Sequence, residues 1–198
     1  MILIVDNYDS FTYNLVDMID KKNEVIVKYP DDPEIYHLDV DGVVISPGPG
    51  HPLDKEDLMK IIKHYENKPI LGVCLGAQAL TCYHGGDVIQ SEFIMHGKTD
   101  QMRIIKDTKL YRNIPEYSEI MRYHSLISNS KTIPEAFIIT AETKDCIQSF
   151  EHSQLLHFGI QYHPESFATA DGVQIINNFL NIVKEDKSNG TTSTIKTV

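Results

Sequence analysis

Cys74 stands between two glycines in the segment Pro69-Ile-Leu-Gly-Val-Cys-Leu-Gly-Ala-Gln-Ala-Leu80. The apolar start predicts a buried strand, and Gly72 and Gly76 allow that strand and a following helix to pack closely around a sharp turn. Such a turn exposes the sulfur and points the free amides of the helix N-terminus at it, which favours the thiolate and can bind an oxyanion. The spacing predicts a cysteine nucleophile, although a lone cysteine after an apolar run is also an ordinary core residue.

A histidine and a glutamate late in the chain have the types that a cysteine nucleophile needs as partners. The segment Phe158-Gly-Ile-Gln-Tyr-His-Pro-Glu-Ser166 begins as an apolar strand, and Pro164 favours an extended His163. Residues two apart in an extended chain project to the same side, so Glu165 can orient and charge-stabilise the imidazole. His-Pro-Glu alone is equally a loop with a solvated carboxylate. Beside the cysteine turn, it predicts a base and its orienting group.

A third segment, Val43-Val-Ile-Ser-Pro-Gly-Pro-Gly-His-Pro52, reads as a short strand followed by a stiff loop. Its glycines allow backbone amides to approach a ligand, and its prolines restrict the loop. An oxyanion hole needs a second backbone donor beside the amide of Leu75, and we expect Gly50 to provide it. Taken alone, the loop is only a rigid turn.

Together these segments resemble the class I glutamine amidotransferases. Within that class they are similar to the amidotransferase subunits of anthranilate synthase and of aminodeoxychorismate synthase. The resemblance covers about residues 1–183 and rests on several motifs in order, which are residues 6–15 (DNYDSFTYNL), 46–50 (SPGPG), 96–98 (HGK), 122–126 (RYHSL) and 163–166 (HPES).

The resemblance implies that Cys74 is the nucleophile, that His163 is the general base and acid, and that Glu165 orients His163. It also implies contacts with an L-glutamine substrate from Gly48, Pro49, Gly50, Gln78, Ser125 and Leu126. One position departs, because the family usually has histidine where this chain has Ala77. We expect this change to alter packing near the pocket without removing the chemistry.

The implied activity is hydrolysis of glutamine to glutamate and ammonia. Ammonia is a nucleophile only when unprotonated, so it must pass to its acceptor inside protein. The chain contains no segment resembling a chorismate-binding synthase domain, and we therefore expect its partner to be a separate, chorismate-utilising synthase subunit. Anthranilate synthesis, in the tryptophan pathway, is the main interpretation; aminodeoxychorismate synthesis for folate, or both, is the alternative. The aromatic segment Tyr8–Tyr13 is a candidate docking surface, or else it fills core at the first helix.

Two other classes of function share parts of this pattern. A cysteine esterase or peptidase would have the same turn at Cys74, but the Pro-Gly-Pro-Gly loop and the Arg-Tyr-His-Ser-Leu motif resemble the glutamine-binding pattern. A scaffold protein that has lost catalysis would keep the fold. The presence of Cys74, His163 and Glu165 argues against that interpretation.

Composition limits the remaining possibilities. The 198 residues carry 18 basic and 28 acidic side chains, a net charge of −10, which disfavours nucleic acid as a partner. Three cysteines without close pairing suggest neither a disulfide framework nor a zinc site, and no cofactor or metal is expected in this chain. No apolar stretch approaches the roughly 20 residues that cross a bilayer, so no membrane partner is expected, and a reducing cytoplasm suits a free thiol.

The order of predicted elements indicates an α/β fold. Strands at residues 2–5, 25–28, 42–45 and 70–73 alternate with helices at about 10–20, 55–65 and 76–83, which predicts a doubly wound, mostly parallel sheet with helices on both faces. Strands at 102–105, 138–141, 147–150 and 156–161 have few helices between them and predict a mixed or antiparallel extension. A last helix at about 171–183 completes one domain, residues 1–184, and the polar residues 185–198 are expected to form a flexible tail.

Overall fold

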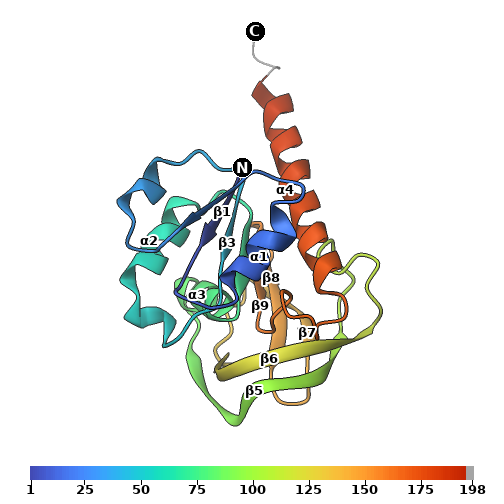
Figure 1. Cartoon of the computed structure of the whole chain (residues 1–198). Coiled ribbons are helices and arrows are strands. Elements are labelled where there is room, and N and C mark those ends of the chain that lie inside the picture. Colours follow the sequence, from blue (N-terminus) through green and yellow to red (C-terminus); the bar gives the residue numbers. More distant parts are fainter. Residues whose placement is uncertain (195–198) are drawn as a thin grey trace.

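The computed structural model describes residues 1–194, with side chains for residues 1–190, and contains a mixed sheet with helices on both faces (Figure 1). Short 3₁₀ turns at Pro33–His37 and Pro52–Asp54 follow β2 and β3. The strands are β1 Ile2–Val5, β2 Val25–Lys28, β3 Gly42–Ile45, β4 Ile70–Val73, β5 Val88–Ile104, β6 Tyr117–Ser128, β7 Phe137–Glu142, β8 Ile147–His152 and β9 His157–Ile160, and the helices are α1 Thr12–Ile19, α2 Glu56–His64, α3 Leu75–Tyr83 and α4 Gly172–Thr194.

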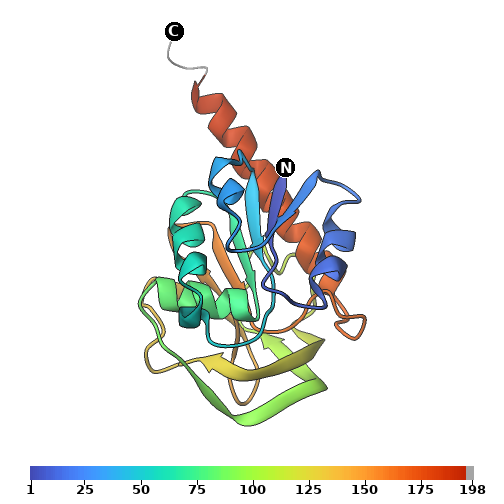
Figure 2. The same cartoon turned by 60° about the vertical axis from the view of Figure 1, so that its left-hand side comes forward.

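The first half of the chain builds most of the parallel part of the sheet. The described strands follow the order β2-β1-β3-β4-β9-β8-β7-β5-β6, and the first five of them run parallel. Successive side chains of a strand face opposite sides, so Ile2 and Ile4 pack beneath α1 and α4, whereas Leu3 and Val5 pack beneath α2 and α3. Figure 2 shows the two helix pairs on opposite sides of the central strands. This confirms the predicted doubly wound architecture.

The second half adds the predicted antiparallel extension, in the order β9-β8-β7-β5-β6. The structure differs from the prediction at its outer edge. The strand predicted at 102–105 is only the end of β5, which starts at Val88 and pairs along its length with β6, a strand that was not predicted. Most β5 side chains are exposed and several β6 side chains are polar, so neither strand has a clear apolar alternation. The hairpin is stabilised by pairing, and register shifts between Gln90 and Met95 and between His96 and Lys98 bend it.

The last helix is longer than the sequence indicates. Its apolar side chains end at Val183, and that residue was predicted to be its end, but α4 continues to Thr194 and extends beyond the sheet (Figure 1). The predicted helix end was wrong because helical hydrogen bonds within the backbone extend the element past its last core contact. Residues 195–198 of the expected tail lie outside the described residues, and its flexibility stays a prediction. Among the described helices, none has the length and apolar character needed to cross a bilayer.

Candidate active site

Cys74 occupies a strained turn at the carboxyl end of β4, immediately before α3. Its backbone has φ 52° and ψ −102°, a conformation that non-glycine residues rarely adopt. The flanking glycines are required by close approach, because a Cβ on Gly72 would lie 2.4 Å from the backbone of Gly76, and one on Gly76 would lie 2.4 Å from the carbonyl oxygen of Ile45. The turn has the geometry predicted for a nucleophile elbow.

His163 and Glu165 follow β9, the strand adjacent to β4. The His163 Nδ1 atom lies 2.6 Å from Oε1 of Glu165, and both side chains are buried. The predicted contact is therefore present, but a turn forms it, in which the Ser166 amide donates to the His163 carbonyl oxygen. The other ring nitrogen, Nε2, is buried without a hydrogen-bond partner, and the Cys74 thiol is among the groups that interact with the ring.

The charge state of His163 is set by competing effects. Burial of the ring opposes protonation, but interactions with Cys74 and with Glu165 outweigh it and raise the pKa of His163 to about 10. The rings of Phe11 and Tyr123 lie edge-on to the imidazole, with centroids 6.1 and 5.3 Å away. The site therefore favours an imidazolium beside the sulfur, shielded from water by two aromatic rings.

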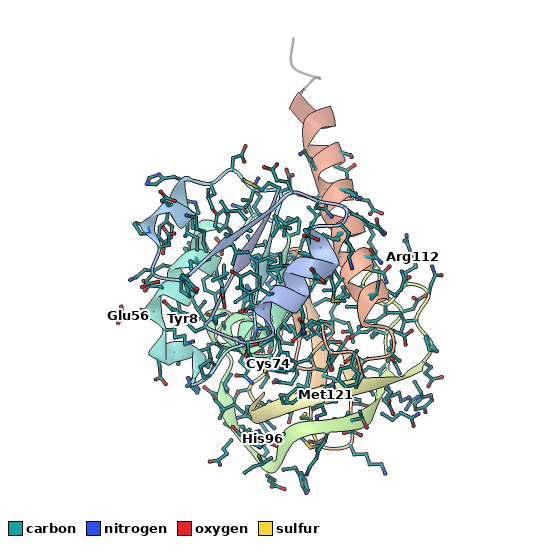
Figure 3. All side chains as sticks on the ribbon, viewed as in Figure 1. Tyr8, Glu56, Cys74, His96, Arg112 and Met121 are labelled. Carbon is teal, nitrogen blue, oxygen red and sulfur yellow. The ribbon has the colours of Figure 1, made fainter. Side chains whose placement is uncertain are left out.

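A pocket of about 450 Å³ opens at Cys74. Figure 3 shows Cys74 between the carboxyl end of the parallel strands and the β5–β6 hairpin, which carries His96. The pocket is lined by all six residues for which the resemblance implies contacts with glutamine. They are Gly48, Pro49, Gly50, Gln78, Ser125 and Leu126. Gly50 has φ +86°, a backbone conformation that glycine adopts without strain. Leu75 is the first residue of α3 and is buried, and its part in an oxyanion hole stays a prediction.

Several pocket residues were not identified from the sequence. They are His51, Gln90, His96, Tyr123 and His124. His96 and the Arg122–Leu126 segment stood in motifs, but without a predicted β5–β6 hairpin nothing indicated which of their side chains faced the nucleophile. Gln161 was also missed, although it precedes His163 by the same two-residue step that separates His163 from Glu165.

Arg122 supports the pocket wall formed by β6, because it contacts His124 on the same strand. Its guanidinium is fully buried and forms ion pairs with Asp100 at 2.5 Å and Asp145 at 2.6 Å. Its Nε atom donates to Nε2 of His124, 3.1 Å away. Burial, together with the Arg122 charge, lowers the pKa of His124 to about 4. His124 therefore faces the pocket as a neutral ring, and this motif holds the β6 wall in place.

Two further sequence expectations can be compared with the structure. Ala77 is buried in the apolar cluster beneath α2 and α3 and does not line the pocket, so the departure from the family pattern lies in core packing. In the aromatic segment, Tyr8 and Tyr13 are 61% and 65% exposed. Phe11 instead points inward to Tyr123 and His163. The half-buried Phe11 thus contacts the site, and a docking role for the two exposed tyrosines stays a prediction.

The comparison with protein families gives the class of protein. The sequence model of the glutamine amidotransferase class-I family matches residues 3–183, and the chain belongs to that family. In the described part of the chain, no group of three or more histidine, cysteine or acidic side chains is placed to hold a metal ion.

Within this family, the chain is similar to proteins named as component 2 of two synthases. The chain is 39% identical over 192 residues to anthranilate synthase component 2 of Lactococcus lactis, covering 94% of this chain and 97% of the relative. It is 40% identical to aminodeoxychorismate/anthranilate synthase component 2 of Bacillus subtilis, covering 94% and 98%. A solved structure of a glutamine amidotransferase from Thermotoga maritima has a TM-score of 0.70 over 96% of this chain and 84% of that one, and at 17% identity it supports the fold alone.

Proposed function

We propose that this protein is the glutaminase subunit of a chorismate-utilising synthase, with anthranilate synthase as the main assignment. The observation that carries the proposal is the convergence of Cys74, His163 and Glu165 from β4 and the loop after β9 beside a pocket of suitable size. Family membership and relatives named as component 2 of anthranilate synthase support it.

The reaction follows from the charges in the site. The Cys74 thiolate, paired with the His163 imidazolium, attacks the side-chain carboxamide carbon of L-glutamine. Amides of Gly50 and Leu75 stabilise the oxyanion, and loss of one such donor costs about 100-fold or more in rate. The imidazolium then protonates the leaving nitrogen, ammonia departs and a γ-glutamyl thioester remains. Water, deprotonated by neutral His163, hydrolyses the thioester to glutamate and restores the thiolate–imidazolium pair.

Glutamine recognition is assigned to the pocket wall. The loop residues Gly48, Pro49 and Gly50 form one side, and Ser125 and Leu126 of β6 form the other. Gln78 projects between them from α3, and its side-chain amide donates to the Leu126 carbonyl oxygen at 2.9 Å. The proposed reaction uses side chains and backbone amides of this chain and needs no cofactor.

The ammonia requires a receiving protein. Water at neutral pH would protonate it, so we assign a heteromeric complex in which a synthase subunit covers the site. Tyr8 and Tyr13, exposed on the segment whose Phe11 contacts His163, are the proposed docking residues. A cytoplasmic location is part of the proposal, because Cys74 must remain a free thiol and the three cysteines are unpaired.

Aminodeoxychorismate synthesis is the second candidate product pathway. Relatives include an aminodeoxychorismate synthase component 2 from Serratia marcescens, 39% identical over 191 residues, and a Bacillus subtilis relative named for both pathways. The glutaminase chemistry is the same in each case. The two assignments differ only in the synthase that receives ammonia.

The test has two arms. Glutamate release is measured for the wild type and for Cys74→Ala, alone and with the purified large subunit of anthranilate synthase or of aminodeoxychorismate synthase. We expect turnover to rise when chorismate and the correct synthase are added, and Cys74→Ala to abolish it. Cys82→Ala, which changes a cysteine at the far end of α3, is the matched control. The identity of the aminated product assigns the pathway. Unchanged glutamine turnover in Cys74→Ala would show that Cys74 is not the nucleophile and would contradict the proposed mechanism.

A further inference from the structure

Gln161 contacts the nucleophile from the same strand end that presents His163. Its side chain is buried, 4% exposed, and its Nε2 atom donates to the Cys74 sulfur at 3.5 Å. Its backbone amide is held by the carbonyl oxygen of Gln148 on β8 at 2.8 Å. Two residues later, the His163 amide is held by the carbonyl oxygen of Met121 at 3.0 Å. The thiol is therefore contacted by the same anchored segment that carries His163.

The orientation of the Gln161 amide is decided by its neighbours. The carbonyl oxygen of Leu126 can only accept, so the Gln78 side chain must present its NH₂ group to it. The same Gln78 nitrogen donates to Oε1 of Gln161 at 3.1 Å. With its oxygen engaged there, Gln161 presents its own NH₂ group to sulfur. A flipped amide would place two donors against each other and an oxygen against the sulfur.

We propose that Gln161 is a positioning residue for the glutaminase reaction, which stabilises the Cys74 thiolate by hydrogen bonding and links it through Gln78 to the pocket wall. This inference rests on the proposed function, because it requires Cys74 to react as a thiolate. An amide N–H stabilises a thiolate more than a thiol, since hydrogen bonds to a charged acceptor are the stronger ones. Gln78 lines the pocket, so the chain of hydrogen bonds runs from the pocket wall to the sulfur.

The test is the pH dependence of Cys74 alkylation by iodoacetamide, followed by mass spectrometry of the peptide that contains Cys74. Gln161→Met keeps the length of the side chain and removes both hydrogen bonds. We expect the half-maximal pH of alkylation to rise by about one unit, and alkylation at pH values below it to slow about tenfold, since one unit corresponds there to a tenfold change in thiolate population. The titratable groups around Cys74 are the same in both proteins. They are His163, which is paired with Glu165, and the pocket residues His51, His96, Tyr123 and His124.

The chain offers a matched control in Gln148. Its buried side chain also donates to a cysteine sulfur, that of Cys146 at 3.1 Å, from the neighbouring strand β8. Gln148→Met should lower stability without moving the Cys74 alkylation profile. An unchanged profile in Gln161→Met, or an equal shift in Gln148→Met, would overturn the proposal.

A second variant separates hydrogen bonding from packing. Gln161→Glu has nearly the same shape but puts a carboxylate against the thiolate, so we expect its half-maximal pH to rise further than in Gln161→Met. A profile like that of the wild type would also overturn the proposal, and this variant serves if Gln161→Met does not fold. Alkylation does not depend on glutamine turnover. If Cys74→Ala abolishes turnover while the Gln161 variants alkylate normally, the positioning role fails and the proposed function stands.

Discussion

Buried or half-buried histidines lie at both edges of the parallel sheet, and they are held in opposite charge states. At the carboxyl edge, His163 has a pKa raised to about 10. At the other edge, where β9 begins and α3 ends, burial lowers the pKa values of His157 and His84 to about 4. His157 starts the strand after which His163 follows, so a single short segment contains both environments.

The difference shows that burial alone does not decide the charge of an imidazole. Burial opposes protonation at both edges, but of these three rings only His163 has a carboxylate within 2.6 Å. His157 instead pairs with the ring of His84 at 3.0 Å and with the carbonyl oxygen of Glu66 at 2.9 Å. A neutral ring satisfies those partners, whereas a charged one would face a second histidine. Of these three rings, only the one beside the thiol is therefore strongly favoured as an imidazolium.

The histidines at the two edges also make the stability of the folded state depend on pH in opposite directions. The raised pKa of His163 stabilises the folded state fully below pH 6.5, and this contribution is lost as the pH rises towards 10. Because the pKa values of His84 and His157 are lowered, the folded state is more stable above pH 6.5 than in acid. This stability is lost as the pH falls from 6.5 towards 4. The fold is thus weakened from one edge by acid and from the other by base.

The largest expected effect comes from exchanging histidine for glutamine at each edge. His163→Gln removes the base and acid of the proposed reaction, and we expect kcat/KM for glutamine to fall by about 10²–10⁴. His157→Gln should keep kcat/KM within about twofold per folded molecule and lower the free energy of unfolding by about 1 kcal/mol. Steady-state kinetics and urea denaturation of both variants measure the contrast. Comparable activity losses in the two variants would erase the distinction between the edges.

A smaller effect is expected when His163 loses its carboxylate. In Glu165→Gln the imidazolium is less favoured, so the pKa of His163 falls and the alkaline limb of kcat/KM moves to lower pH. We expect turnover at neutral pH to fall by about 10–100-fold, which corresponds to one or two pKa units of lost stabilisation. A pH–rate profile from pH 6 to 10 tests this, with Glu151→Gln, which changes a half-buried glutamate on β8, as control. An unshifted alkaline limb would show that Glu165 does not hold the charge.

The smallest effect concerns acid stability. When the pH is lowered from 7 to 5, the unfolded chain binds protons at His84 and His157, whereas the folded chain does not. The free energy of unfolding should therefore fall by about 2 kcal/mol or more. In His84→Asn this slope should become shallower, whereas His37→Asn, at an exposed position, should leave it unchanged. Urea denaturation at several pH values gives the slope. Equal slopes in wild type and His84→Asn would mean that these rings do not titrate with folding.

The parts of the fold that could be predicted are those whose sequence carries its own pattern. The first four strands begin and end at the predicted residues because each is a short apolar run, and β1, β3 and β4 are buried on both faces. β6 was missed because its polar residues find partners in other elements, such as Arg122 with Asp100 on β5 and with Asp145. β5 has mostly exposed side chains and owes its length to pairing with β6. A strand that is stabilised by distant pairing leaves little periodicity to recognise.

By itself, the sequence determined the identity and order of the residues proposed to react, because the spacing of Gly72, Cys74 and Gly76 has a local steric cause in the elbow. Likewise, His163 and Glu165 are two residues apart and meet through a local turn. Only the tertiary structure decided which side chains complete the site. Gln161 reaches the sulfur, and the β5–β6 hairpin closes the pocket, because strands distant in the chain become neighbours in the sheet. Such neighbours are set by long-range pairing and burial, and local residue patterns do not encode them.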